Sequence, residues 1–299
     1  MGRVGKSASL RAMGAAWDAG ITLFDTSRNY GFGEAEAVLG QFLRGKRDQA
    51  VIATKFGIAP QTLSPMKRVA VPIARVAKRL PGFGSRLKRG PATTVHGEFS
   101  VSGLRSSLET SLKALQTDRV DILFLHEATP EALLNEELIS ELEALVRSGK
   151  VLRVGLYGSA KLCTHGLTDG PPILKAMQFG ADLMDPLATH LPDHNDRGGL
   201  LIGNHPFGSE DRIARISALL AAMAVDEAVP ADLRDKLWGL NWDGVLEAVL
   251  GICLALTDAV VFSMMREQHI QHNVRAVEMC RFSTGELELM HERILGFKL

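Results

Sequence analysis

Apolar residues recur along the chain with two alternating periods. Short runs of consecutive apolar residues are typical of strands buried on both faces of a parallel sheet. Between them, apolar residues return every three or four positions, which is typical of amphipathic helices. The predicted strands end at Asp25, Lys55, His126, Leu156, Phe179, Gly203 and Phe262. The predicted helices cover residues 7–19, 34–43, 104–115, 131–148, 246–256 and 267–280.

This alternation favours a (β/α)8 TIM barrel over two doubly wound domains. The dinucleotide fingerprint of the doubly wound fold is absent, because Gly31-Phe32-Gly33 lacks the third glycine. We therefore predict a single domain over residues 1–299. A barrel of this type needs eight strands, and residues 1–6 are too few for both a strand and a loop. Either one strand has escaped the pattern, or the chain begins after the first strand; we predict a barrel that lacks its first strand.

One segment, at about residues 60–98, interrupts the alternation. It is rich in Lys and Arg between residues 66 and 89, which by itself would suit nucleic acid or a membrane surface. Apolar residues also recur in it at helical spacing, at Val69, Ile73, Val76 and Leu80. We predict an inserted helix that packs beside the barrel mouth and shapes a substrate pocket.

Composition excludes several classes of protein. The chain of 299 residues has 34 Lys and Arg against 34 Asp and Glu, whereas a general nucleic-acid binder should be basic. No apolar run reaches the roughly 18 residues of a membrane helix. The three cysteines, odd in number and far apart, favour a reducing compartment. We expect a cytoplasmic protein with neither a nucleic-acid nor a membrane partner; its oligomeric state stays open.

Ionisable residues end three successive predicted strands, at Asp25, Lys55 and His126. In a parallel barrel these ends converge on one mouth, and a short loop can bring Tyr30 over it. A phenol has an ordinary pKa of about 10. We expect the ammonium of Lys55 to lower the pKa of Tyr30, and Asp25 to keep Lys55 charged. His126 can hydrogen-bond to the same oxygen or orient a carbonyl. Tyr30 is then the predicted general acid when a carbonyl accepts a hydride from a cofactor, and the general base in reverse.

Residues 19–40 resemble the signature of the aldo/keto reductase family. They contain an apolar strand, Asp-Thr, a Tyr five residues after the Asp, and then Glu-x-x-Leu-Gly. Residues 53–55 and 125–126 resemble two further motifs of that family. The resemblance implies a (β/α)8 barrel that reduces an aldehyde or ketone with NADPH, or oxidises an alcohol or sugar. Its small-molecule substrate is a carbonyl compound or a sugar. The implied catalytic residues are Asp25, Tyr30, Lys55 and His126.

The resemblance also implies a cofactor site. Gln178 matches the family glutamine that binds the nicotinamide amide. The segment 260–273 resembles the last strand and the helix start that hold the adenosine phosphate. Its candidate residues are Ser263, Arg266, His269 and Asn273. The resemblance implies NADP as the cofactor. NAD is the alternative, because His269 stands where the family usually has a basic residue to contact the 2′-phosphate of NADP.

The chain departs from the family pattern at one cofactor motif, and one pair of histidines has the spacing of metal ligands. The family usually has Ser-Asn after the strand that begins at residue 151, where this chain has Tyr157 and Ser159 nearby as substitutes. His269 and His272 have metal-ligand spacing, but no third ligand is evident, so we predict no metal.

Two other functions stay open. Lys55 could form a Schiff base, as in a lyase built on the same barrel. Pairing with Asp25 disfavours this, because it should keep Lys55 protonated. The missing first strand motivates the second alternative, a non-catalytic nucleotide-binding barrel.

Overall fold

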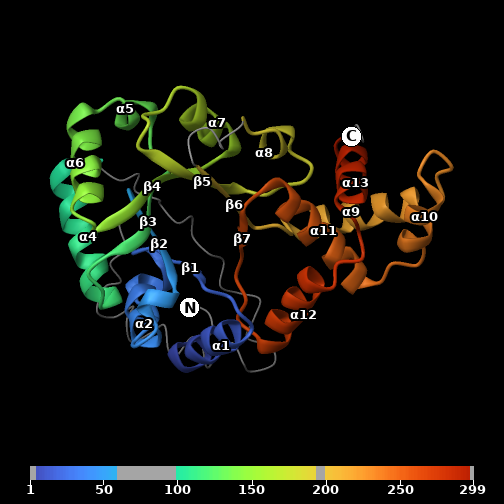
Figure 1. The fold of residues 1–299 in the computed structure, drawn as a ribbon, viewed down its shortest axis with the longest axis horizontal. Coiled ribbons are helices and arrows are strands. Elements are labelled where there is room, and N and C mark those ends of the chain that lie inside the picture. Colours follow the sequence, from blue (N-terminus) through green and yellow to red (C-terminus); the bar gives the residue numbers. More distant parts are fainter. Residues whose placement is uncertain (1–4, 59–98, 193–198, 297–299) are drawn as a thin grey trace, which may run out of the picture.

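A computed structural model describes residues 5–58, 99–192 and 199–296. In these ranges seven parallel strands form one sheet in chain order, curled into a nearly closed barrel (Figure 1). The strands are β1 (Leu23–Asp25), β2 (Val51–Phe56), β3 (Val120–His126), β4 (Val151–Gly158), β5 (Leu174–Gly180), β6 (Leu200–Asn204) and β7 (Ala259–Val261). All seven lie where the apolar runs predicted them. The predicted barrel fold with seven strands is confirmed.

Helices cover the outside of the sheet (Figure 1). The longer ones are α1 (Lys6–Asp18), α2 (Ala35–Phe42), α4 (Val101–Leu115), α6 (Glu136–Arg147), α7 (Ala160–Thr168), α9 (Glu210–Met223), α11 (Trp242–Leu256), α12 (Glu267–Glu278) and α13 (Thr284–Gly296). The shorter ones are α5 (Pro130–Leu133), α8 (Pro186–Thr189), α10 (Ala231–Leu237) and the 3-10 turns η1 (Tyr30–Gly33) and η2 (Arg47–Gln49). None of the helices in the described ranges is long and apolar enough to span a membrane.

The helical predictions needed correction in two respects. The single helix predicted over residues 131–148 is two helices, because the Asn135 side chain accepts a hydrogen bond from the Leu138 amide at 3.1 Å and starts α6. Helices α7, α8, α9, α10 and α13 were not predicted. The apolar spacing of a helix is present in α9 and α13 and was overlooked: their buried residues, such as Ile216 and Leu220, or Leu287 and Met290, lie three or four positions apart. Helices α7, α8 and α10 span too few residues for such a period to be clear. The predicted inserted helix, at about 60–98, lies outside the described residues.

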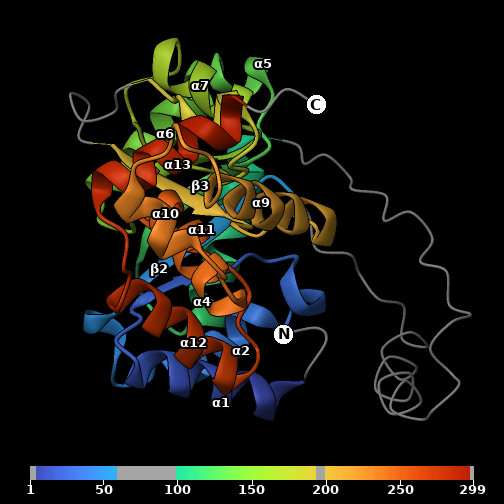
Figure 2. The ribbon, with the colours of Figure 1, turned by 90° about the vertical axis from the view of Figure 1, so that its right-hand side faces the viewer.

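The core has an inner and an outer layer, because successive side chains of a strand point to opposite faces. The outer layer packs between the sheet and the helices. The inner layer fills the barrel with Ala53, Ile122, Phe124, Ala176 and Ile202. A second core joins α9, α10, α11 and α13 at one end of the molecule (Figure 2).

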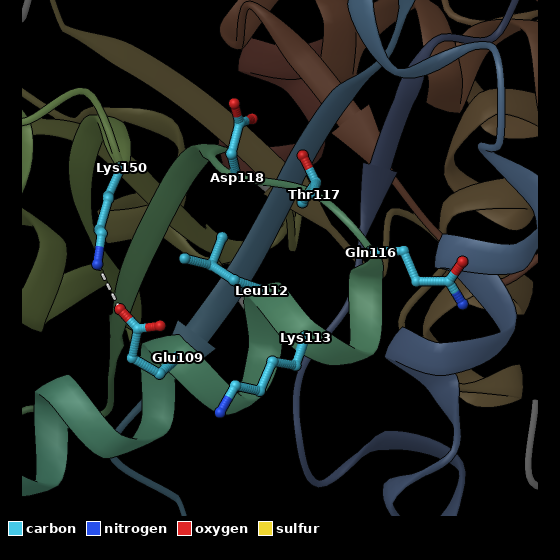
Figure 3. A pocket seen from close by; sticks show the side chains of 7 residues that line it. All are labelled: Glu109, Leu112, Lys113, Gln116, Thr117, Asp118 and Lys150. Carbon is cyan, nitrogen blue, oxygen red and sulfur yellow. Dashed lines mark hydrogen bonds and ion pairs between the residues drawn. The ribbon is translucent and has the colours of Figure 1, made fainter.

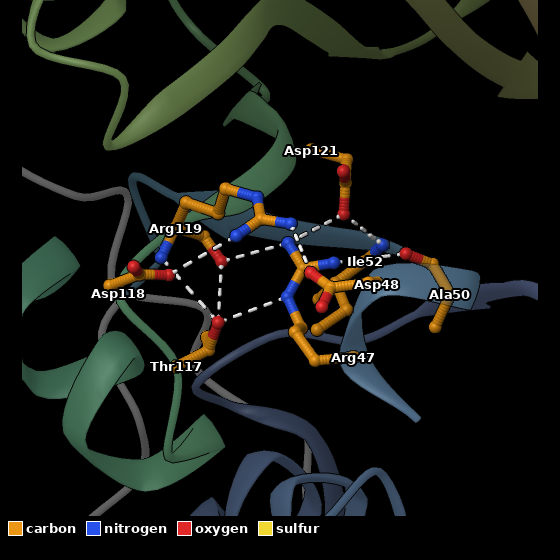
Figure 4. Close-up of polar contacts among 8 residues, drawn as sticks. All are labelled: Arg47, Asp48, Ala50, Ile52, Thr117, Asp118, Arg119 and Asp121. Atoms are coloured by element: carbon orange, nitrogen blue, oxygen red, sulfur yellow. Dashed lines mark hydrogen bonds and ion pairs between the residues drawn. The ribbon is translucent and has the colours of Figure 1, made fainter. Parts of the chain in front are cut away.

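A polar network ties the amino-terminal ends of β2 and β3 together (Figure 4). The Arg47 guanidinium lies 2.8 Å from the Asp121 carboxylate and donates to the Arg119 carbonyl at 3.0 Å. The same carboxylate accepts the Ile52 amide at 2.8 Å. Charge-assisted hydrogen bonds of this kind hold the strands in register at the end opposite to the mouth.

The first and last parts of the barrel meet through helices. In the described ranges β1 pairs only with β2, and β7 only with β6. Helices α1 and α12 lie side by side next to this opening (Figures 1 and 2). Ile270 of α12 is fully buried and packs against Ala12 and Ala16 of α1.

Candidate active site

The last inward-facing layer of the barrel is polar. Lys55, His126, Gln178 and Asn204 each stand two residues after an inner-core residue of their strand, so they face the interior. Tyr157 pairs with His126 on one side and with Gln178 on the other. This layer lies at the carboxyl-terminal ends of the strands, where barrel enzymes carry their active sites.

Asp25 and Lys55 form an ion pair at this mouth, as expected. The Lys55 ammonium also donates to the carbonyl of Thr26 at 3.3 Å, and the Lys55 side chain is fully buried. Burial lowers the pKa of Lys55 and raises the pKa of Asp25, while the ion pair opposes both shifts. The carboxylate therefore offsets part of the penalty that burial places on the ammonium.

Three aromatic rings surround the same ammonium. The Lys55 nitrogen lies 5.2 Å from the ring centre of Tyr30, 5.1 Å from that of Tyr157 and 5.8 Å from that of Phe124. Aromatic rings attract a cation through their negative faces. The ammonium is thus held by one carboxylate and three rings.

The expected effect of Lys55 on Tyr30 was wrong. Burial raises the pKa of Tyr30 above its ordinary value, and the nearby Asp25 and Tyr157 raise it further. The physical reason is that burial removes water from the half-buried phenol and that the Asp25 carboxylate repels a phenolate, and together these effects outweigh the Lys55 ammonium. Tyr30 stays protonated over the physiological range, which suits a proton donor.

His126 is buried and uncharged near neutral pH. Burial and, to a smaller extent, the nearby Lys55 charge together lower its pKa to about 4. Its ring meets the ring of Tyr157 edge-on, with centroids 4.6 Å apart. Its Nδ1 atom is buried, and no described residue bonds to it. A neutral imidazole carries one N–H that can donate to a carbonyl.

Two amides complete the layer. The Gln178 side chain lies beside Asp25 and lowers the pKa of that carboxyl, yet its own side-chain oxygen is buried without a partner in the described ranges. The Asn204 side chain lies beside the Tyr157 hydroxyl, and its oxygen is 3.0 Å from Nδ1 of His205. A buried polar atom without a partner is costly. The free Gln178 oxygen therefore fits a ligand that brings a hydrogen-bond donor.

A hollow of about 330 Å³ lies between the start of α12 and the loop after β6. Three of the predicted cofactor residues line it: Ser263, His269 and Asn273. Arg266 stands at the start of α12, outside the lining, and Gln178 lies in the mouth. His205 joins the two sites, because it lines the hollow and its charge lowers the pKa of Asp25.

Sequence reasoning missed Asn204 and His205, which follow a weak apolar run. Of the two substitutes named for the family Ser-Asn, Ser159 starts α7 by accepting the Leu162 amide at 3.2 Å. Tyr157 lies in the mouth instead. Side chains two residues apart on a strand share a face, and Tyr157 follows the inward-facing Gly155 by two residues. This spacing could have predicted that Tyr157 faces the mouth.

Another hollow, of about 520 Å³, lies at the amino-terminal end of β3 (Figure 3). Its lining includes the ion-paired Glu109 and Lys150. It lies at the end of the barrel opposite to the mouth, so we do not place the chemistry there. In the described ranges no three His, Cys, Asp or Glu side chains gather as a metal site would require.

Comparisons with known proteins agree with this picture. The family model described as the aldo/keto reductase family matches residues 1–160. An aryl-alcohol dehydrogenase (NADP(+)) of Phanerodontia chrysosporium is 30% identical over 158 residues, which cover 52% of this chain and 35% of that protein. The L-glyceraldehyde 3-phosphate reductase of Escherichia coli is 26% identical over 328 residues, covering 95% of this chain and 83% of that protein.

A solved aldo/keto reductase from Klebsiella pneumoniae, in complex with NADP and acetate, has a TM-score of 0.60 at 20% identity. The match covers 100% of this chain and 90% of that one. This likeness concerns the fold. The chain spans about a third of the length of several curated relatives that it matches, among them two aryl-alcohol dehydrogenases and a D-threo-aldose 1-dehydrogenase.

Proposed function

This chain belongs to the aldo/keto reductase family, and from that premise we propose that it transfers a hydride between NADP and a small carbonyl compound or its alcohol. The observation that supports the proposal is the mouth itself. Tyr30 and His126 are uncharged hydrogen-bond donors there, beside the ion pair of Asp25 and Lys55. This is the donor set that a carbonyl oxygen needs when it becomes an alcohol.

The cofactor, when bound, supplies the hydride that no side chain can provide. Gln178 would hold its amide, and Ser263, His269 and Asn273 would hold its far end along the hollow. The orphaned oxygen of Gln178 fits such a group. Arg266 lies at the start of α12, from where it would add positive charge near that end.

The chain's own residues move the proton. In reduction, Tyr30 donates its hydroxyl proton to the substrate oxygen, and His126 orients that oxygen through its N–H. The buried ammonium of Lys55 then stabilises the phenolate that forms. Asp25 keeps Lys55 charged through both directions of the reaction.

The substrate class follows the names of relatives. Those names include an aryl-alcohol dehydrogenase and a glyceraldehyde phosphate reductase, so we propose an aldehyde, ketone or sugar as substrate. The name of one relative, an aryl-alcohol dehydrogenase, includes NADP(+), which supports NADP over NAD. The cytoplasmic location and the absence of a nucleic-acid partner stay predictions.

The two alternatives predict different behaviour. A Schiff-base lyase needs a neutral Lys55, which the buried ion pair with Asp25 disfavours. Borohydride would trap a substrate on Lys55 in that case. A non-catalytic barrel is favoured by the seven-strand sheet of the described ranges. It would bind the nucleotide without ever oxidising it.

Tyr30→Phe tests the proposal. Fluorescence titration with NADPH and NADH should give the same affinities for wild type and variant, since Tyr30 acts on the substrate. Turnover with an aldehyde panel should fall by roughly 10²–10⁴-fold, the usual contribution of a general acid. Thermal melts of both proteins control for folding. Loss of cofactor binding in the variant would contradict the role of Tyr30, and wild type that binds neither nucleotide would overturn the proposal.

A further inference from the structure

We propose that Tyr157 is a positioning residue of the candidate site, whose ring holds the His126 imidazole and the Lys55 ammonium in place. This inference rests on the proposed function for its effect on turnover. Its structural part stands on the geometry of the mouth alone.

The place of Tyr157 in the sheet is central. It stands on β4, between His126 of β3 and Gln178 of β5, and pairs with both in register. The backbone carbonyl of Tyr157 accepts the Glu127 amide at 2.7 Å. The strand end is therefore fixed on either side, and the ring leaves it in a defined direction.

The side chain is held at both ends. Its ring packs edge-on against His126 at 4.6 Å, and the Lys55 nitrogen lies 5.1 Å from its centre. The Asn204 side chain lies beside the Tyr157 hydroxyl and in turn contacts His205. A ring fixed in this way limits the orientations that a neighbouring imidazole can adopt.

The second phenol of the mouth is placed differently. Tyr30 begins the turn η1, in which Gly31 and Phe32 both adopt positive φ angles, 60° and 62°. It extends from a loop, whereas Tyr157 is part of the sheet. The loop phenol is the one placed to meet a substrate, and the strand phenol is the one placed to support its neighbours.

The Tyr157 ring also keeps water from His126. Burial is the main cause of the low pKa of His126. A smaller aliphatic side chain at position 157 would leave space beside the imidazole, and water entering that space would move the pKa back toward the ordinary value of about 6.5.

A histidine titration by NMR tests this without any substrate. His126 is assigned by comparison with His126→Gln. In wild type it should protonate near the value of about 4 that burial sets. Tyr157→Phe keeps the ring and should change this little, whereas Tyr157→Leu should raise the pKa of His126 by at least one unit, roughly the scale of burial effects. An unchanged titration in Tyr157→Leu overturns the proposal.

Two variants serve as controls for this titration. Leu152→Ala, at an exposed position of the same strand, should leave the titration as in wild type. Asn204→Ala removes the amide beside the Tyr157 hydroxyl and leaves the ring, so, like Tyr157→Phe, it should change the titration little. Should Tyr157→Leu not fold, Tyr157→Met decides instead: a raised His126 pKa supports the proposal, and an unchanged one overturns it.

Kinetics then separate positioning from mere packing. Tyr157→Leu should lower kcat at least tenfold, leave the NADPH affinity within about twofold, and move the acid limb of the pH profile upward. Tyr157→Phe should lose only about threefold. Wild-type kcat in Tyr157→Leu would overturn the proposal. If wild type itself turns over no carbonyl, the proposed function fails, and the titration still decides the role of Tyr157.

Discussion

At the scale of single residues, burial decides the charge of every group in the mouth. Burial favours the neutral forms of Tyr30 and His126, and the ion pair with Asp25 opposes the same effect of burial on Lys55. The nearness of the Lys55 ammonium alone did not predict the protonation of Tyr30, because burial and the Asp25 carboxylate outweigh that ammonium.

Acid should destabilise the protein through His126. Its pKa is about 4 in the folded chain and about 6.5 in the unfolded one. As pH falls from about 6.5 to 4, the unfolded state takes up the proton first, so the free energy of unfolding falls. Urea unfolding at pH 7.5 and 4.5 measures the difference. His126→Gln should show a smaller difference than wild type, and an equal one would contradict the assignment. His291, whose pKa burial also lowers, contributes to the remainder.

At the scale of elements, the family-like run Glu-x-x-Leu-Gly in α2 serves packing. Glu36 is buried and accepts a hydrogen bond from the Thr54 hydroxyl at 2.6 Å. Thr54 directly precedes Lys55 in the chain. Gly40 lets α2 approach α4 closely, since a Cβ there would lie 2.4 Å from the Leu115 carbonyl oxygen. The motif thus places β2, and with it Lys55, against two helices.

Gly40→Ala should therefore destabilise the fold although Ala favours helices. The added methyl meets backbone atoms of α4, and overpacking of this kind costs about 1–3 kcal/mol. Gly14→Ala in α1 is the matched control, because nothing lies within 4 Å of its added Cβ. It should be stabilising by about 0.5–1 kcal/mol. Chemical denaturation of both variants measures the two effects, and equal stabilities would show that the α2–α4 contact is not tight.

At the scale of the whole molecule, the barrel is held together across its opening by helices. In the described ranges no strand pairs with the free edges of β1 and β7. The contact of α1 with α12 therefore joins the first and last elements. The hollow with Ser263 and His269 lies at the start of α12, so this contact also supports the proposed cofactor site.

Ile270→Ala should weaken that contact. Ile270 is fully buried between α12 and α1, and such a truncation costs about 2–5 kcal/mol. Hydrogen exchange should become faster in α1 and α12 before it does in β3 and β4. Val277→Ala, at an exposed position of the same helix, is the control. Uniformly faster exchange over all strands would instead mean that the helices and the sheet unfold together.

Much of this protein could be predicted from its sequence, because strands buried on both faces are continuous apolar runs. Those runs placed all seven strands, and their ends placed Asp25, Lys55 and His126 at one mouth. Short helices, such as α7 and α10, span too few residues to show an apolar period and were missed. Their existence depends on the surfaces that they cover.

The sequence by itself determined the barrel, the order of its strands and the four residues grouped at its mouth, because periodicity and chain order act locally. The tertiary structure alone decided the protonation of Tyr30, the place of Tyr157 between Lys55 and His126, and the gathering of Ser263, His269 and Asn273 in one hollow. Burial and contacts between distant strands control these features, and both arise only when the chain is folded.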